Sequence, residues 1–447
     1  MPLFKLGKVK LPHRKSSRAL ESVRMPAPAS VTIPMSQHIG AACTPTVKVG
    51  DAVCVGTVIG DSDAHVSAPI HSSVSGVVKK IDNFLLSSGK SCLAVTIESD
   101  GQMTVAPEVL PVEVKSFEDL LKAVRDSGAV GLGGAGFPTS VKLEAAASGK
   151  IEKIIVNGAE CEPYITSDTR TMIEDTELVK AGLLRILSLS GVPSAIIGIE
   201  KDNKLSIKAM TEAFSDDERV EISILPASYP QGAEKVLVYN TTGKVVPEGE
   251  LPASVGVIVL NVTTIAFIEK YIRTGMPLVE KRVTVAGSAI KTEKNVIVPI
   301  GTSVSEVVEF AGGVSEEPKK ILFGGPMMGV AMYTKETPII KNCNAVVLLN
   351  EKDTNTGKTT ACIHCGACLA ACPFGLNPVA YAKALGLSDR EERAKRLMED
   401  RVNICMECGC CSFVCPAKRP LVTNNKLAKA DLRAYCEAKA KREEGKE

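Results

Sequence analysis

The sequence predicts a multidomain protein of mixed α/β and α+β class. An alternating β pattern with glycine turns runs through residues 47–78, strand and helix patterns alternate across the middle of the chain, and two cysteine-rich motifs follow near its end. A chain of 447 residues has room for roughly three or four domains. Because these patterns change along the chain, we expect separate modules.

The overall composition narrows the function classes. A net charge of +2 at pH 7 gives no support for a nucleic-acid-binding surface, which needs a strongly basic face. No apolar run reaches the roughly eighteen residues of a membrane helix, and the N-terminus lacks the apolar core of a signal peptide. Fifteen cysteines without an export signal indicate metal or redox chemistry, because the cytosol keeps thiols reduced.

Residues 1–28 form a basic N-terminal arm. One acidic residue, Glu21, stands among seven basic residues, which are Lys5, Lys8, Lys10, Arg14, Lys15, Arg18 and Arg24. Such a segment is either a solvated tail or a contact for anionic lipid or an acidic partner subunit. The sequence leaves both interpretations open.

Residues 29–105 form a predicted β domain with glycine turns. The pattern resembles the barrel-sandwich fold of biotinyl and lipoyl carriers. A carrier needs a lysine at its hairpin tip, and none lies between Asp51 and Lys79. We therefore expect a structural or docking module.

Residues 110–278 form the next predicted domain and contain a glycine-rich loop. Gly131, Gly133 and Gly136 match G-x-G-x-x-G, but residues 117–127 before them have the periodicity of an amphipathic helix. A dinucleotide-binding Rossmann turn must follow a strand, so we reject that interpretation. What remains is a loop whose backbone amides can approach a ring or a phosphate, at the start of a helix that carries Lys142.

Three predicted strands, at 154–157, 220–225 and 255–260, run into polar turns. Ligands of an open α/β sheet bind at such carboxyl ends. The turns carry three carboxylates that could accept hydrogen bonds from ribose hydroxyls or a nicotinamide amide, namely Glu160, Glu162 and Glu234. For each glutamate taken alone, a solvated turn is the plainer interpretation.

Four motifs of this region resemble the FMN and NADH module of the flavoprotein subunit of respiratory complex I. They are G-L-G-G-A-G-F-P-T-S-V-K at 131–142, N-G-A-E-C-E-P at 157–163, Y-P-Q-G-A-E at 229–234 and N-V-T-T at 261–264. The resemblance implies a complex I flavoprotein-like α/β domain that binds FMN and NADH.

The same resemblance assigns site residues by matching position. The FMN contacts would be Gly131, Gly133, Lys142, Asn157, Tyr229, Gly232, Asn261 and Thr264. NADH would lie beside Gly134, Phe137, Glu162 and Glu234, with Glu160 as a further cofactor contact. Glu162 would orient the nicotinamide and is the predicted catalytic residue. The chain departs from the family's pattern at Leu132, Ala145, Ala159 and Ala233.

Residues 279–335 alternate strand, helix and glycine turn. They resemble the small β-grasp domain, of the SLBB type, that follows the flavin module in the same families. We expect residues 336–357 to be a linker, although 345–349 has the composition of a buried strand.

Residues 358–447 contain C-x2-C-x2-C-x3-C-P twice. In two-cluster ferredoxins the fourth cysteine of each motif binds the other motif's cluster. This crossover assigns one [4Fe-4S] cluster to Cys362, Cys365, Cys368 and Cys415, and a second to Cys405, Cys408, Cys411 and Cys372. Structural zinc is the alternative, but zinc sites usually space two cysteine pairs a dozen or more residues apart.

The residues between the two cysteine motifs, 378–401, have helical periodicity. The domain therefore resembles the helical two-cluster ferredoxin domains of larger oxidoreductases. Cys410 lies off the motif and is expected not to bind a cluster, and Cys161 receives no role.

The order of barrel-sandwich, flavin, β-grasp and two-cluster modules is similar to that of the RnfC family, which belongs to the Rnf electron transport complex. The resemblance implies a peripheral, NAD(H)-reactive subunit at the cytoplasmic face of the bacterial membrane, held there by integral membrane and iron–sulfur partner subunits. Its activity would be that of an ion-transporting ferredoxin:NAD+ oxidoreductase, a translocase. As this resemblance implies, FMN would exchange a hydride with NAD(H), and the clusters would carry single electrons.

Two other functions remain open at this point. One is a soluble NADH-dependent flavin and iron–sulfur reductase for cobalamin, and the other is an electron relay without flavin. The sequence does not distinguish Na+ from H+ as the coupled ion, nor does it give the cluster potentials, the direction of electron flow or the partner-contact surfaces.

Overall fold

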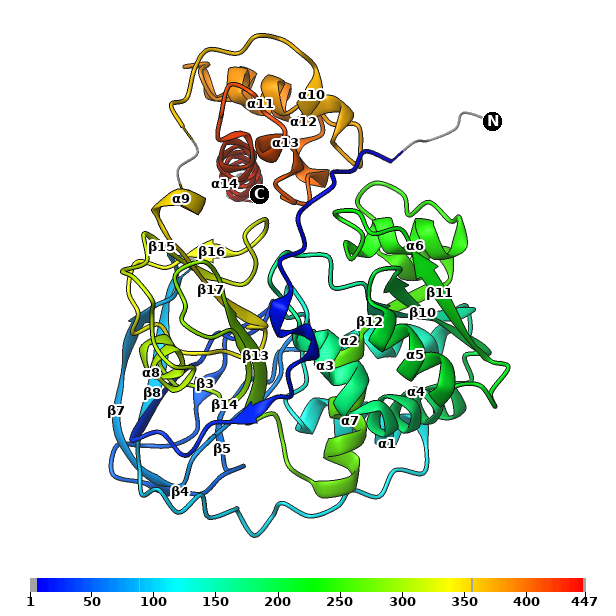
Figure 1. The fold of residues 1–447 in the computed structure, drawn as a ribbon, viewed down its shortest axis with the longest axis vertical. Helices are drawn as coiled ribbons and strands as arrows, with labels where there is room; N and C mark the ends of the chain where they lie inside the picture. Colours follow the sequence, from blue (N-terminus) through cyan, green and yellow to red (C-terminus); the bar gives the residue numbers. More distant parts are fainter. Residues whose placement is uncertain (1–5, 88, 355–356, 445–447) are drawn as a thin grey trace.

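The computed structural model describes residues 6–87, 89–354 and 357–444. Two β-rich domains lie beside an α/β domain, and a small helical domain covers the end where these bodies meet (Figure 1). Below, residues 110–278 are called the flavin domain and residues 358–447 the cluster domain, after the expectations above. Across the described ranges, no helix has both the length and the apolar character that a bilayer span needs.

The N-terminal β domain consists of two small sheets. The first is antiparallel in the order β2-β8-β7-β4, and the second has the order β3-β5-β6. Their strands are β2 (Ser30–Pro34), β3 (Thr44–Pro45), β4 (Ala52–Val53), β5 (Val58–Asp61), β6 (Ile70–His71), β7 (Gly76–Leu85) and β8 (Ser91–Ser99). Val31, Ile33 and Ile59 are buried in the core between the sheets. Alternation of buried and exposed residues along these strands produces this two-sheet packing.

The flavin domain is built on a parallel sheet of four strands in the order β11-β10-β9-β12. The strands are β9 (Lys153–Gly158), β10 (Ser194–Glu200), β11 (Val220–Leu225) and β12 (Val257–Asn261). Both faces are covered, which is why these strands are almost continuously apolar.

The helices of the flavin domain cover its sheet. They are α1 (Phe117–Asp126), α2 (Thr139–Glu144), α3 (Ser167–Glu174), α4 (Thr176–Ser190), α5 (Lys204–Ala213), α6 (Glu234–Thr242) and α7 (Val262–Thr274), with 3-10 turns η2 (Ala145–Ser148) and η3 (Pro252–Val255). Helix α1 begins at a capping box formed by Ser116 and Asp119. It precedes the glycine loop, as predicted, so this loop does not follow a strand.

The second β-rich domain contains a six-stranded sheet in the order β1-β14-β13-β17-β15-β16. The strands are β1 (Val23–Arg24), β13 (Glu280–Ala286), β14 (Lys294–Pro299), β15 (Lys320–Phe323), β16 (Val330–Ala331) and β17 (Ala345–Leu349), packed with α8 (Val304–Phe310). Strand β17 pairs with β13 and β15 and is buried along its length. The expected linker at 336–357 is therefore corrected, because its apolar run completes this sheet.

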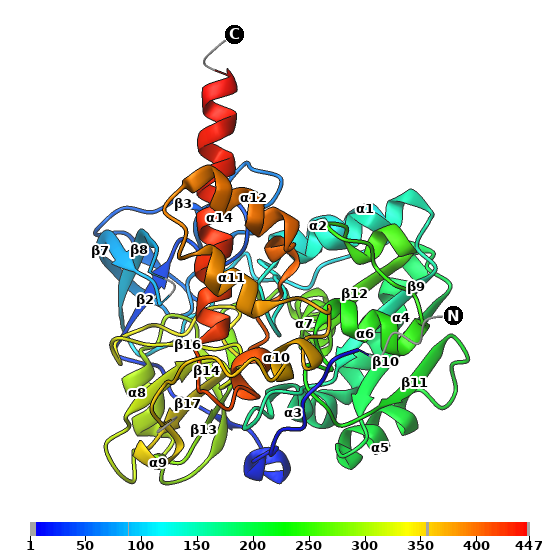
Figure 2. The same cartoon turned by 90° about the horizontal axis from the view of Figure 1, so that it is seen from above.

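The cluster domain is helical. Its elements are α10 (Ala367–Ala370), α11 (Pro378–Ala384), α12 (Arg390–Glu399), η4 (Val402–Ile404), α13 (Cys410–Phe413) and α14 (Leu421–Glu444), and α9 (Glu351–Thr354) precedes it. Helix α14 packs against α11 and α12 and then extends away from the rest of the molecule (Figure 2). Tyr381 and Leu397 are fully buried in the core of the cluster domain. The helical spacer predicted between the cysteine motifs is confirmed by α11 and α12.

The described part of the N-terminal arm is folded onto the protein. Its backbone pairs with Tyr229 through Val9, and the Tyr164 N–H donates to the His13 carbonyl over 2.9 Å. Residues 16–19 form the short helix η1, in which Ser17 is buried. The side chain of Lys15 is 3% exposed. The interpretation as a solvated tail is therefore corrected for residues 6–28, and a contact for lipid or a partner stays a prediction.

Candidate functional site

The glycine loop lies beside the carboxyl ends of the parallel strands. Its two ends meet in a bridge between Val130 and Pro138, and the Gly131 N–H donates to the Phe137 carbonyl over 2.9 Å. The Leu132 N–H donates to the Thr264 hydroxyl at the start of α7, at 3.1 Å. These contacts fix the loop across the edge of the sheet, where an open α/β fold binds its ligands.

The tip of this loop has no room for larger side chains on one side and is open on the other. A Cβ added to Gly133 would lie 2.8 Å from Cγ of Asn261, whereas one added to Gly134 would meet nothing within 4 Å. Both glycines are exposed. The Asn342 amide donates to the Gly134 carbonyl over 3.0 Å and holds the tip from the second β-rich domain.

Asn261 organises the end of strand β12. Its side-chain oxygen accepts from the N–H groups of Thr263 and Thr264, so it caps α7. Its side-chain N–H donates to Asp168 at 2.8 Å, and Asp168 also accepts from the Thr263 hydroxyl at 2.7 Å. Asp168 was not predicted from the sequence, because its contact depends on the packing of α3 against α7.

Two further contacts join predicted site residues from distant segments. Lys142 donates to Glu234 at 2.7 Å and to the Val259 carbonyl at 3.1 Å. The Asn157 amide donates to the Gly232 carbonyl over 2.9 Å. The structure therefore brings the predicted FMN residues to one edge of the sheet.

The two glutamates of the 157–163 motif point to different surroundings. Glu160 accepts from the Asp168 N–H and the Thr169 hydroxyl, both at 2.7 Å, and Lys15 lies 3.7 Å away. The Glu160 side chain is only 4% exposed, so in this structure it stabilises the start of α3 and does not face the open edge. The predicted cofactor contact of Glu160 does not agree with this placement.

Glu162 faces the second β-rich domain. Its two carboxylate oxygens accept from the backbone N–H groups of Met327 and Met328, at 3.0 and 2.8 Å. Burial raises the pKa of Glu162 to about 7, against the opposing effect of these two donors. Burial likewise raises the pKa of Glu160 to about 7, and Lys15 opposes that rise. Both carboxyls therefore sit in surroundings that disfavour charge.

These residues fit a bound flavin mononucleotide. The glycine tip is exposed and leaves open space beside Gly134, Asn157 and Lys142 supply donors, and the N-terminus of the 13-residue helix α7 begins at the same edge. A helix N-terminus favours a phosphate group. When bound, FMN would accept a hydride as a two-electron unit and release single electrons.

The two cysteine motifs fold into the same local backbone. The residue two positions after each first cysteine, His364 or Glu407, has a positive φ, and so does the glycine two positions later, Gly366 or Gly409. A one-turn helix follows in each case, α10 or α13. Because both loops repeat the same two positive-φ positions, we expect them to arrange their thiols in the same way around a cluster.

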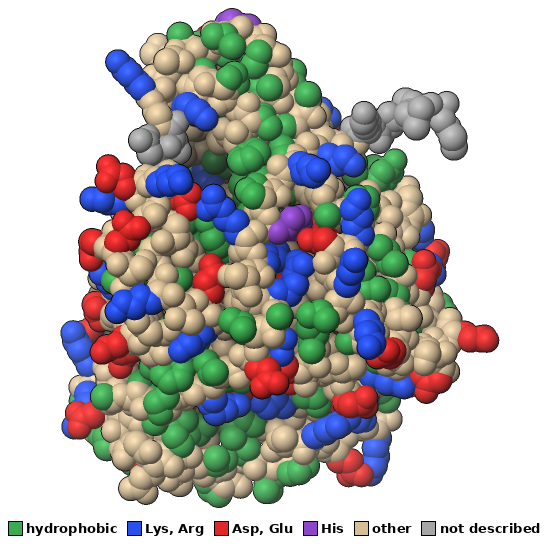
Figure 3. Space-filling view, viewed as in Figure 1, with side chains coloured by type: hydrophobic (Ala, Val, Ile, Leu, Met, Phe, Trp, Pro, Cys, Tyr) green, Lys and Arg blue, Asp and Glu red, His purple; other side chains and the backbone are tan. Residues whose placement is uncertain are grey.

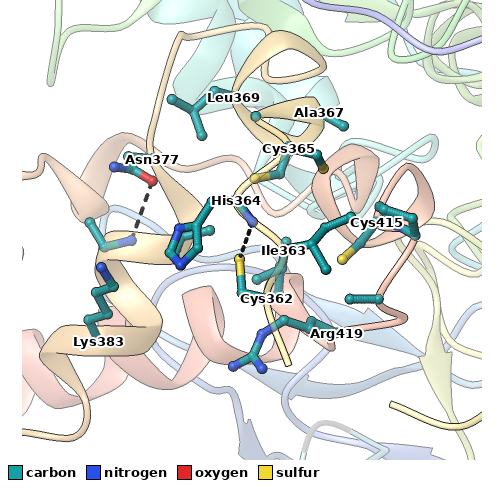
Figure 4. Close-up of a pocket in the computed structure, with 17 residues that line it drawn as sticks. Cys362, Ile363, His364, Cys365, Ala367, Leu369, Asn377, Lys383, Cys415 and Arg419 are labelled. Atoms are coloured by element: carbon teal, nitrogen blue, oxygen red, sulfur yellow. Dashed lines mark hydrogen bonds between the residues drawn. The ribbon is translucent and has the colours of Figure 1, made fainter. Parts of the chain in front are cut away.

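The structure groups the cysteines across the motifs. A cavity of about 300 Å³ is lined by Cys362, Cys365, Cys368 and Cys415, which we call the outer set (Figure 4). A second, smaller cavity is lined by Cys372, Cys405, Cys408 and Cys411, which we call the inner set, and also by Cys410. These are the two groups that the crossover assigned. Four converging thiols in each group fit a cubane cluster, and each cluster would exchange one electron at a time when bound.

Backbone and amide donors point at the sulfurs of both sets. The His364 N–H donates to Cys362 Sγ over 3.4 Å and the Leu376 N–H to Cys372 Sγ over 3.3 Å. The Asn425 amide donates to Cys405 Sγ over 3.4 Å. Hydrogen bonds to cluster sulfurs tune reduction potentials, so these donors fit iron–sulfur ligation.

The inner set adjoins the flavin domain. The hydroxyl of Tyr229, a predicted FMN residue, donates to the Cys408 carbonyl over 2.8 Å. Tyr229 is 2% exposed and packs with Val9 and Cys410. Cys410 occupies the position that Ala367 has in the first motif and is fully buried in this apolar contact. The contact between Tyr229 and the cluster loop had no signal in the sequence.

Models of four protein families match successive parts of the chain. They are the RnfC barrel sandwich hybrid domain over residues 4–102, the Nuo51 FMN-binding domain over residues 124–270, the SLBB domain over residues 282–331 and a 4Fe-4S dicluster domain over residues 358–419. The predicted fold class is confirmed by these four matches.

Curated relatives of the RnfC type match most of the chain. The one from the proton-translocating ferredoxin:NAD(+) oxidoreductase complex of Clostridium ljungdahlii is 43% identical over 83% of this chain and 81% of its own length. The one from the Na(+)-translocating ferredoxin:NAD(+) oxidoreductase complex of Acetobacterium woodii is 40% identical over 95% of this chain and 96% of its own length. The chain belongs to the RnfC family.

A more distant likeness concerns the fold alone. The NAD+-reducing [NiFe]-hydrogenase in its air-oxidised state gives a TM-score of 0.51 at 19% identity, over 70% of this chain and 63% of that chain. For this member of the RnfC family, the FMN-binding and dicluster matches confirm the expected cofactors, FMN and two [4Fe-4S] clusters. The same matches favour iron–sulfur clusters over structural zinc.

Proposed function

We propose that this subunit exchanges electrons between NAD(H) and other subunits of an ion-translocating ferredoxin:NAD(+) oxidoreductase complex. Membership of the RnfC family supports this proposal. Hydride from NADH carries two electrons and a [4Fe-4S] cluster passes one, so a flavin between them is chemically required. The observation that carries the proposal is the contact of Tyr229 at the flavin edge with the cluster loop at Cys408.

At the flavin edge, the protein's contribution is binding and orientation. Gly131 and Gly133 would let the loop backbone approach the flavin closely, while Lys142, Asn157, Asn261 and Thr264 hold the surrounding loops together. Gly134, Phe137 and Glu234 would border the nucleotide, and Glu162 would orient its nicotinamide. No proton-transferring side chain is needed, because the hydride chemistry belongs to the cofactors.

The two cysteine sets differ in position, and this suggests different partners. The inner set adjoins Tyr229, whereas the outer set contains the exposed Cys365 and lines a surface cavity. Hydrophobic side chains gather on the surface of the cluster domain (Figure 3), and exposed Ile363 and Leu369 lie at the outer cavity. We assign the inner set to exchange with the flavin and the outer set to exchange with another subunit.

Membership of the same family supports a proposal for the location. We place the subunit at the cytoplasmic face of the membrane, bound there through integral membrane and iron–sulfur subunits of the complex. Co-purification with integral membrane proteins would support this placement. Recovery as a free protein that reduces cobalamin with NADH would favour the soluble reductase, the second candidate function.

Replacement of Glu162 tests the nicotinamide site. We expect Glu162→Ala to raise the NADH concentration needed for half-maximal FMN reduction about tenfold, because one charge-assisted hydrogen bond contributes about 1.5–3 kcal/mol. FMN and iron contents should stay at the wild-type values. Anaerobic stopped-flow absorbance measures the reduction, and exposed Glu218→Ala in the same domain is the control. Unchanged kinetics in the Glu162 variant would contradict the assignment.

A further inference from the structure

The carboxylate of Glu162 is held by a segment that the known flavin motifs do not include. Residues 324–329, which we call the 324–329 turn, follow strand β15 of the second β-rich domain. The N–H groups of Met327 and Met328 in this turn each donate to one oxygen of Glu162. A carboxylate has about four lone-pair sites, so two remain for a ligand. The turn therefore fixes Glu162 without exhausting its capacity to accept hydrogen bonds.

Gly325 in this turn leaves no room for a side chain beside the carboxylate. A Cβ added there would lie 2.5 Å from Cδ and 2.8 Å from Cγ of Glu162, closer than real Cβ contacts. The backbone of Gly325 is outside the left-handed region, so alanine is permitted by its φ angle. The glycine is thus required by the close approach of Glu162 and not by its own conformation.

The turn is held from the other sides as well. The Gly324 N–H donates to the Ala345 carbonyl on β17 over 2.7 Å, and the Gly329 N–H donates to the Gly325 carbonyl over 2.8 Å. Met327 packs against Tyr229 and the cluster loop at Cys408. A turn anchored to a central strand and to the cluster loop presents its amides in one fixed geometry, as a preorganised site requires.

We propose that the 324–329 turn positions Glu162 for the nicotinamide of NAD(H), and that Gly325 is the positioning residue because any side chain there displaces the carboxylate. This inference rests on the proposed function, in which Glu162 contacts the nucleotide. Gly325 lies against Glu162, so we expect its effect to pass through that carboxylate. The β-grasp domain thereby contributes to nucleotide binding, in addition to packing.

The test is a cycle of four holoproteins, namely wild type, Gly325→Ala, Glu162→Asp and the double variant. NADH affinity is measured anaerobically from the concentration dependence of FMN reduction, with FMN and iron contents determined for each protein. We expect Gly325→Ala to weaken NADH affinity about tenfold with cofactor contents unchanged. Gly386→Ala, at an exposed glycine of ordinary φ in the cluster domain, is the matched control.

The effect of Gly325→Ala in the Glu162→Asp background distinguishes a positioning role from a general loss of stability. Aspartate lacks one methylene and leaves room for the alanine Cβ, so Gly325→Ala should cost at most about twofold in the Glu162→Asp background. An equal loss in both backgrounds, or wild-type affinity in Gly325→Ala, overturns the positioning role. If Glu162→Asp and Glu162→Ala both keep wild-type affinity, the role of Glu162 itself fails. If these two variants lose affinity and Gly325→Ala does not, the positioning role alone fails.

Discussion

The flavin domain and the cluster domain hold their site residues in different ways. In the flavin domain, contacts join residues that are far apart in the chain, such as Asn157 with Gly232 and Leu132 with Thr264, which are 75 and 132 positions apart. In the cluster domain, each set takes three cysteines from one short loop and the fourth from its repeat. The flavin site therefore depends on the packing of a whole domain, and the cluster sites depend on local backbone and metal.

This difference has an energetic consequence. The flavin domain buries a large continuous core around β9, β10 and β12, whereas the cluster domain has a small core around Tyr381 and Leu397. Metal binding contributes directly to folding where the apolar core is small. We expect loss of a cluster to unfold part of the cluster domain and to leave the flavin domain intact.

The strongest test of this contrast compares two adjacent cysteines. Cys411 lies in the inner set, and Cys410 packs in the apolar contact with Tyr229. Cys411→Ala should lose about four of about eight irons, because it removes one thiolate of a cubane. Cys410→Ala should keep all of them. Iron analysis and EPR of the reduced protein measure both, and equal iron losses would show that the crossover assignment is incomplete.

Lys15 offers a test on the flavin side. Its buried side chain lies 3.7 Å from Glu160 and bonds to the Glu160 carbonyl. Lys15→Met should destabilise the flavin domain by roughly 3 kcal/mol, because it leaves a buried carboxylate without its cation. Thermal unfolding followed by flavin release measures this loss. Lys10→Met, at an exposed position of the same arm, is the control. Identical melting curves for the two variants would mean that the arm does not support the site.

The smallest expected effect concerns Glu200 at the carboxyl end of β10. It is 3% exposed, and within the described residues its Oε1 has no hydrogen-bond partner. Burial raises the pKa of Glu200 to about 8, against the opposing effect of Lys15. This pKa lies above the ordinary value of 4.5. The contribution of protonated Glu200 to the free energy of unfolding is therefore fully present below pH 4.5, and it is lost as the pH rises through 8.

Glu200→Gln should therefore gain stability over the wild type as the pH rises. We expect little difference at pH 5 and roughly 1–2 kcal/mol in favour of the variant at pH 9. Denaturant unfolding of the flavin domain at several pH values measures this difference. Exposed Glu221→Gln on β11 should show no such trend. A pH-independent difference for Glu200→Gln would show that the group does not titrate on folding.

The sequence was sufficient to predict those features that depend on residues close together in the chain. The cysteine spacing predicted which thiols come together, and the apolar run at 345–349 predicted the buried strand that became β17. Its place in the sheet was missed, because pairing with β13 and β15 depends on segments far away in the chain. Local sequence patterns predict individual helices and strands, and they do not predict which strands pair with each other in a sheet.

Tertiary contacts explain the remaining differences at the candidate site. Glu160 and Glu162 are two residues apart and look alike in the sequence, yet one contacts α3 and the other contacts the 324–329 turn. Asp168 contacts Asn261 and Lys15 contacts Glu160, and both contacts join segments that are far apart in the chain. Resemblance to a family located the site, but the orientation of each side chain required the structure.

The proposed function requires one chain to convert between two-electron and one-electron transfer. An anaerobic NADH titration of the purified protein, with flavin absorbance and the EPR signal of reduced clusters recorded together, tests this conversion. We predict that NADH bleaches the flavin and that reduced clusters then appear. If about eight irons are present and NADH changes neither signal, the chain is an electron relay and the nicotinamide site is contradicted.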